Sequence, residues 1–202
     1  METSLTTHLF PAFKEWAAIV EALGAGEQIL LLRKGGIAEG RGGFQVKNQR
    51  FWLYPTFFHA QLEESKPTAA KYFEIANRLD APLAHDGAVG APRDASSPVT
   101  LRYFAEVVET NFVDNWSRIQ ALDAQHLWKE SLVRERFDWS KPPGLHVIAV
   151  RVYATAEPHV VMPTAAMLGC KSWIEVPVDF DATASEPVLG EDDFARMLKS
   201  LR

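Results

Sequence analysis

The spacing of apolar residues predicts helices in several parts of the chain. In the first, apolar side chains recur every three or four residues, Pro11 suits an early position, and Gly24 and Gly26 follow as a stop signal. Pro67 opens a second helix in the same way. The helices predicted from such spacing cover residues 11–23, 57–64 (a short one), 67–79, 116–139 (in one or two pieces) and 191–201.

Apolar runs bounded by turn residues predict strands. Residues 146–154 are apolar at both odd and even positions, which is typical of a strand buried on both faces. Residues 27–32 form a shorter apolar run that follows turn glycines. The predicted strands cover residues 27–32, 45–53, 99–108, 146–154 and 172–178.

The order of these elements predicts the fold class. Strands do not alternate regularly with helices, which disfavours a doubly wound sheet. We expect an α+β fold with a mixed, mostly antiparallel sheet or a small open barrel, and flanking helices. With 202 residues, we expect a single domain over 1–202. Residues 80–98, rich in Asp, Gly, Ala and Pro, predict an irregular surface connection.

Composition narrows the class of protein. Hydrophobic residues make up 47% and charged residues 23% of the chain, which are ordinary globular values. No apolar run approaches the roughly 20 residues that span a bilayer, and the first residues lack a signal-peptide pattern. The single cysteine, Cys170, rules out an intrachain disulfide and a cysteine-rich zinc site, and we expect its thiol to be inert. We expect a soluble cytoplasmic protein without a membrane partner.

Charge is distributed unevenly along the chain. The net charge of -5 argues against strong non-specific duplex binding, which relies on a basic surplus. Within residues 33–50, however, Glu39 is the only acidic residue. The cations of this segment are Arg33, Lys34, Arg41, Lys47 and Arg50. Two interpretations stay open: a solvated surface, or a local patch that binds an anion.

The basic, glycine-rich turn is the first candidate site. Arg33 and Lys34 end a predicted strand, and Gly35 and Gly36 follow. Backbone amides there could face an anion, with the arginine binding it through two parallel hydrogen bonds and the lysine adding a point charge. The spacing matches neither the phosphate-binding P-loop nor the dinucleotide fingerprint. The alternative is a connection whose cations only keep it soluble.

Three further arginines are candidate ligand-binding residues. Arg134 and Arg136 alternate with aromatic residues near Trp139, a composition that suits base stacking combined with phosphate contact. The alternative is core packing with surface ion pairs. Arg151 lies inside an apolar strand and requires a partner, because an unpaired buried charge is costly. It either faces a cleft or pairs with an acidic residue, and we favour the pair.

Two His-x-x-x-Glu spacings are candidate metal ligands. On a helix, His59 with Glu63 and His126 with Glu130 would each share one face. Chance occurrence and packing are the stronger interpretation, so no metal and no cofactor is predicted. His59 is the candidate acid–base catalyst. No acid-x-Lys tripeptide occurs on a predicted strand, which disfavours a nuclease built on paired acids and a lysine.

Five blocks of sequence carry a resemblance to a known family. They are AFKEWAAIVEALGAGEQILLLRKGGI, FWLYPTFFHAQ, HLWKESLVRERFDW, GLHVIAVRVY and LGCKSWIEVPV. Together they resemble the prokaryotic family catalogued as domain of unknown function 1802 (DUF1802), over about residues 11–198. The resemblance implies no activity and no catalytic residue.

Three functional hypotheses follow. The first is an accessory module that binds a nucleic acid or another phosphate-bearing ligand through the basic turn. The second is a metal-dependent hydrolase that uses the two His-x-x-x-Glu pairs. The third is a structural protein whose acidic C-terminal helix docks on a partner protein. Whether the chain is an enzyme stays open at this point.

Overall fold

A computed structural model gives the fold and describes residues 8–34, 46–57, 60–80, 97–139, 141–169, 171–180 and 185–202. The strands are β1 (Phe10–Trp16), β2 (Leu30–Arg33), β3 (Arg50–Thr56), β4 (Val99–Val113), β5 (Leu145–Val161), β6 (Trp173–Val176) and β7 (Ser185–Pro187). The α-helices are α1 (Ala17–Gly24), α2 (Ala70–Asp80), α3 (Trp116–Ala121), α4 (Glu130–Asp138) and α5 (Glu191–Ser200). Short 3-10 turns cover Pro67–Ala69, Asp123–Gln125 and Ala165–Met167.

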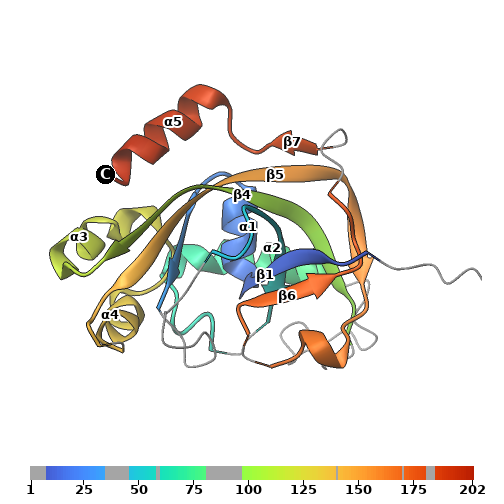
Figure 1. Cartoon of the computed structure of the whole chain (residues 1–202), viewed down its shortest axis with the longest axis horizontal. Coiled ribbons are helices and arrows are strands. Elements are labelled where there is room, and N and C mark those ends of the chain that lie inside the picture. Colours follow the sequence, from blue (N-terminus) through green and yellow to red (C-terminus); the bar gives the residue numbers. More distant parts are fainter. Residues whose placement is uncertain are drawn as a thin grey trace, which may run out of the picture.

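These strands form one curled sheet in the order β2-β5-β4-β3-β1-β6, with β7 added beside β5. Among the described pairings, β1 and β3 run parallel and all others are antiparallel. Figure 1 shows the sheet curving around α1 as an open half-barrel, with α3 and α4 at one end and α5 outside β5. The predicted α+β fold with a mixed, mostly antiparallel sheet is therefore confirmed.

The sheet is buried on both faces along its central strands. Neighbouring residues of β3 project to opposite sides: Phe51 packs against Phe13, with ring centroids 5.3 Å apart, and Trp52 against Phe104 at 5.9 Å. Each buried apolar side chain of this size stabilises the fold by about 2 kcal/mol. Double burial explains why β3 and β5 appear in the sequence as continuous apolar runs.

Two register shifts bend the long central strands. The pairing of β4 with β5 shifts between Leu101 and Tyr103, and again between Val107 and Glu109. Such irregularities increase the local twist and let a sheet curl. Both strands extend past the predicted ranges 99–108 and 146–154, because the more polar end of each strand still pairs with the beginning of the other.

The prediction of a helix over residues 11–23 is wrong in its first half. β1 occupies this segment and is paired on both sides, so that Ala12 lies opposite Trp52 of β3 and Ile174 of β6. The apolar spacing fits a helix, but an interior strand buried on both faces satisfies it equally well. The helix begins only at Ala17, and it ends as predicted, with Gly26 at a φ of 70° just beyond it.

Most other predicted elements are confirmed. The helix over 67–79 appears as the Pro67–Ala69 turn and α2, the segment 116–139 as α3 and α4, and 191–201 as α5. The short helix predicted over 57–64 is wrong for residues 60–64, which form turns. The connection at 81–96 lies outside the described residues, and the single domain stays a prediction. No helix in the described ranges is long and apolar enough to cross a membrane.

Candidate functional site

Arg33 and Glu15 form a buried ion pair at the end of the sheet. Arg33 closes β2, and its Nη2 lies 2.7 Å from Glu15 Oε2. The same guanidinium donates to the backbone oxygens of Lys14 at 2.9 Å and Leu32 at 3.0 Å, and lies 4.4 Å over the ring of Phe13. Glu15 is only 2% exposed. Most of the Arg33 guanidinium is therefore engaged by groups of the protein itself.

Arg136 is a second guanidinium at the same end, and aromatic rings hold it. From α4, its Cζ lies 5.1 Å from the ring centroid of Trp16 and 5.7 Å from that of Trp128. It makes no hydrogen bond or ion pair with any residue in the described part of the chain. Burying a cation without such a partner is costly.

The pKa of Arg136 is lowered, as expected for a guanidinium that has no direct ion-pair partner among the described residues. Burial, followed by the charge of Arg33, lowers its pKa to about 10, against the attraction of more distant carboxylates. Those carboxylates belong to Glu15, Glu135 and Glu64. The guanidinium still carries its full charge at neutral pH. An anion bound beside it would relieve both unfavourable effects.

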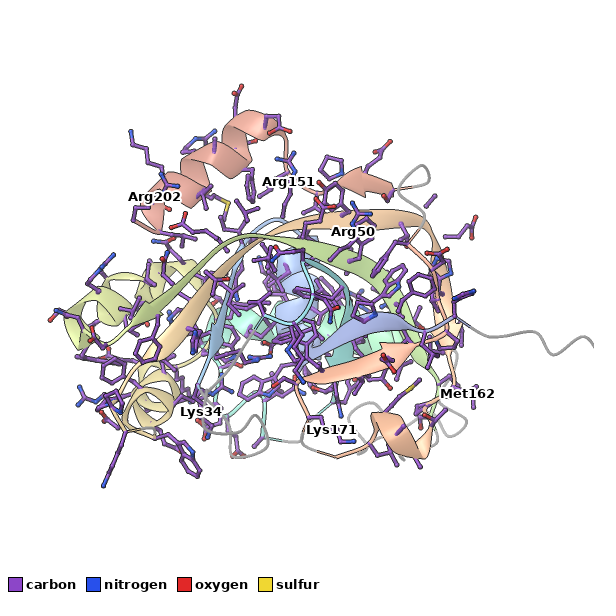
Figure 2. The ribbon with its side chains drawn as sticks, in the orientation of Figure 1. Lys34, Arg50, Arg151, Met162, Lys171 and Arg202 are labelled. Atoms are coloured by element: carbon purple, nitrogen blue, oxygen red, sulfur yellow. The ribbon has the colours of Figure 1, made fainter. Side chains whose placement is uncertain are left out.

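Lys34 completes a cluster of three cations, which we call the cationic cluster: Arg33, Lys34 and Arg136. Lys34 lies beside α4 in Figure 2, and its Nζ is 3.6 Å from the ring centroid of Trp139. Burial lowers the pKa of Lys34, and the nearby charge of Arg136 lowers it further. As with Arg136, no hydrogen bond joins this amine to the described residues.

Several buried polar atoms around the cationic cluster have no hydrogen-bond partner in the part of the chain that the structure describes. They include Trp128 Nε1, Ser65 Oγ, Gln61 Oε1 and His126 Nδ1. Trp128 lies beneath Arg136 and pairs with Ser65 through an isolated β-bridge. Gln61 donates to the backbone oxygen of Thr56 at 2.5 Å, and the Thr56 hydroxyl donates to that of Glu15. Such atoms are rare in folded proteins, and the indole N–H and the hydroxyl are donors that suit an oxyanion.

Arg134 and Arg151, also predicted as ligand-binding residues, have partners elsewhere. Arg134 Nε lies 2.6 Å from Asp138 Oδ2 on the exposed side of α4. Arg151 lies beneath α5 (Figure 2), with Nη2 2.8 Å from Glu191 Oε1. The acidic partner that we favoured for Arg151 is therefore present. The structure brings together Arg33, Lys34 and Arg136 of the predicted set, whereas Gly35 and Gly36 lie outside the described residues.

The candidate metal ligands do not share a helical face where they are described. His126 follows the Asp123–Gln125 turn in an extended conformation, while Glu130 is the first residue of α4 and accepts a hydrogen bond from Gln120. No group of three or more potential ligands occurs among the described residues. The candidate catalyst His59 and the thiol of Cys170 lie outside those residues.

His126 is buried and neutral at physiological pH. It is 4% exposed, and burial, followed by the charge of Lys66, lowers its pKa to about 4. Its ring lies 5.6 Å from that of Trp128. His126 therefore packs between the Asp123–Gln125 turn and Trp128. Because its pKa is low, the imidazole is uncharged near pH 7.

Sequence reasoning missed Glu15 and Trp16, because it placed both in a helix. One signal could have found them: Lys14 and Glu15 are charged residues within an apolar stretch, as Arg151 is. A buried charge requires a partner, and Arg33 is the partner of Glu15.

A recess of about 410 Å³, open to solvent, lies elsewhere on the described molecule. It is bounded by α5, α3 and the outer face of β4 and β5. Its lining includes Glu109, Arg118, Val147, Leu198 and Leu201. None of the cationic cluster takes part in it, so the recess and the cluster are separate features.

Comparison with known proteins gives a family and no function. Neither a curated protein nor a solved structure matches the chain. The family model described as domain of unknown function (DUF1802) matches residues 12–200, nearly the whole chain. The resemblance seen in the sequence is confirmed, and the chain belongs to the DUF1802 family.

Proposed function

We propose that this chain is a binding module for a phosphate-bearing ligand, with Arg136 and Lys34 as the groups that contact the phosphate. The single observation behind the proposal is the state of Arg136: a half-buried guanidinium held by two indole rings, without a hydrogen bond or ion pair to the described residues. Natural proteins pair such charges, and a ligand anion would supply the pair.

The charge of the cationic cluster favours phosphate over a single carboxylate. Three cations meet one carboxylate in ion-pair contact, that of Glu15, which leaves two positive charges. A phosphate monoester carries about -1.5 to -2 near pH 7, so its charge is comparable. Arginine offers two parallel donors to such a group, and lysine adds a point charge beside it.

Arg33 supports the proposed site without contacting the phosphate directly. Its hydrogen bonds to backbone oxygens and its ion pair with Glu15 hold the end of β2, from which Lys34 emerges. Its charge also adds to the potential at Arg136. We therefore expect the loss of Arg33 to weaken binding through both position and charge.

A labelled strand of deoxyribose phosphate without bases tests the proposal, because it presents phosphate alone. Fluorescence anisotropy with a ten-residue abasic strand, in 20 mM and 300 mM KCl, should show binding that weakens with salt. Arg136→Met should weaken it at least tenfold. Arg151→Met is the matched control, because Arg151 also lies over an aromatic ring but has an ion-pair partner.

Two outcomes would overturn the proposal. One is the absence of binding to the abasic strand in 20 mM KCl by a protein whose circular dichroism shows it to be folded. The other is equal weakening by Arg136→Met and Arg151→Met, which would assign the interaction to overall charge. Competition by inorganic pyrophosphate should displace the strand if the site recognises phosphate.

A further inference from the structure

We infer that the ligand is a single-stranded nucleic acid, one of whose bases stacks on Trp139 while the adjacent phosphate reaches Lys34 and Arg136. This inference rests on the proposed function and adds to it the class of ligand. Its starting observation is an indole ring that is 53% exposed and carries the amine of Lys34 over its face, while the charge of Arg136 acts on that amine. Neither cation has an ion-pair partner among the described residues.

The exposure of Trp139 stands out against the other tryptophans near the cluster. Trp128 is fully buried, and Trp16 is half-buried beneath Arg136. Trp139 instead lies just past the end of α4, with the amine of Lys34 over its face. Tryptophan is highly buried on average, so an indole exposed beside a charged site is a candidate contact surface.

A nucleotide matches this arrangement chemically. It joins a flat aromatic base to a phosphate through one sugar, and the structure places a flat indole against Lys34, whose amine lies within the electrostatic influence of Arg136. Proteins that bind single strands combine aromatic stacking with cations that follow the backbone. A duplex would keep its base faces covered, and its binding would require a larger basic surface than a chain of net charge -5 with two available cations offers.

The number of cations sets the salt dependence. With two phosphate contacts, from Lys34 and Arg136, the logarithm of the binding constant should fall with the logarithm of salt concentration with a slope of about -1.4. Lys34→Met should reduce the slope to about -0.7. Lys71→Met is the matched control, because Lys71 already forms an ion pair with Glu27, and it should leave the slope unchanged.

The decisive experiment compares strands with and without bases. Fluorescence anisotropy is measured with a labelled ten-nucleotide thymidine strand, the abasic strand of equal length, and the thymidine strand paired with its complement. We expect the thymidine strand to bind at least fivefold more tightly than the abasic strand, and the duplex to bind no better than the abasic strand. A ribose strand of uridines serves as the RNA arm of the same comparison.

Variants of Trp139 assign the difference to stacking. Trp139→Ala should weaken binding of the thymidine strand at least fivefold and leave the abasic strand unchanged, while Trp139→Phe should stay within about threefold of wild type. Since Trp139 is exposed, both variants should fold, and their circular dichroism checks this.

The outcomes separate this inference from the proposed function. If the thymidine and abasic strands bind equally and Trp139→Ala affects neither, base stacking is refuted while the phosphate site stands. If the duplex binds most tightly, recognition of single strands is also refuted. If no strand binds and pyrophosphate fails as well, the proposed function falls together with the inference.

Discussion

Two arginines at different places in the molecule have similar aromatic surroundings and different electrostatic ones. Arg151 lies 5.0 Å from the ring centroid of Phe194, and Arg136 lies 5.1 Å from that of Trp16. Arg151 also pairs with Glu191 and donates to the backbone oxygen of Leu189. Arg136 has neither kind of contact among the described residues. Arg151 therefore links β5 to α5, whereas no ion pair or hydrogen bond to the described residues engages the donors of Arg136.

The ion pairs of the two regions also differ in burial. On the α5 side, Arg151 is 14% exposed but its partner Glu191 is 84% exposed, so water screens the pair, and Arg202 is 66% exposed where it meets Glu109. Pairs of this kind contribute about 0–1 kcal/mol. At the α4 end, Arg33 and Glu15 are 13% and 2% exposed. Breaking a buried pair leaves one charge without compensation and costs several kcal/mol.

The largest expected effect follows from this difference in burial. Glu15→Gln should lower the free energy of unfolding by about 3 kcal/mol, because both partners of this pair are shielded from water and the substitution removes a counter-charge that solvent does not screen. Urea denaturation followed by tryptophan fluorescence measures the change. Glu191→Gln is the control and should cost less than about 1 kcal/mol. Equal losses in the two variants would refute the contrast between the two regions.

A pH-dependent effect should follow from His126, which borders the cationic cluster. Its pKa is about 4 in the folded protein, against an ordinary value of 6.5, so the unfolded chain binds a proton that the folded chain does not. Stability should therefore fall as the pH is lowered from about 6.5 toward 4, by about 2 kcal/mol at pH 5. The groups that act on this imidazole are Lys66, Asp123, Arg136 and the backbone of Trp128.

His126→Gln isolates this contribution, because glutamine does not titrate. The difference in unfolding free energy between wild type and variant should change by about 2 kcal/mol from pH 7 to pH 5, in favour of the variant at low pH. Denaturant curves at both pH values measure it. A difference that does not change with pH would show that the folded histidine titrates near its ordinary value.

Sequence reasoning predicted much of the fold because the strands of this sheet are apolar on both faces. The same property misled it at β1, where the spacing of Phe13, Trp16 and Ala17 fits a helix and an interior strand equally well. For the site, the sequence predicted individual residues but not which of them lie close together. Charge patterns single out Arg33 and Arg136, but nothing in the sequence connects two residues about a hundred positions apart. Their proximity depends on how β2 and α4 meet in the folded chain.

A third prediction concerns stability at the two contrasted arginines. Arg151→Met should lower the free energy of unfolding by about 1 kcal/mol, because it removes the ion pair and the hydrogen bond that hold α5. Arg136→Met should leave it unchanged or raise it slightly, because it replaces a half-buried charge, which has no ion-pair partner among the described residues, with an apolar chain of similar length. Thermal unfolding by differential scanning calorimetry compares the two. A clear loss of stability in Arg136→Met would indicate a partner outside the described residues.

The smallest expected effect tests whether aromatic surroundings strengthen an exposed arginine. Arg134 pairs with Asp138 four residues on and lies 4.7 Å from the ring centroid of Trp116, whereas Arg196 pairs with Asp193 and is 76% exposed. Helical pairs of this kind contribute about 0.3–0.5 kcal/mol, and an exposed cation–π contact adds about 0.5. Arg134→Ala should therefore lower the free energy of unfolding by up to about 1 kcal/mol and Arg196→Ala by about half as much, as measured by urea denaturation.

Salt provides the control for this comparison. Because salt screens an ion pair more than a cation–π contact, the difference between the two variants should persist in 0.5 M NaCl. If it disappears there, the ring of Trp116 contributes nothing, and the aromatic setting of Arg136 would have to be explained by packing alone.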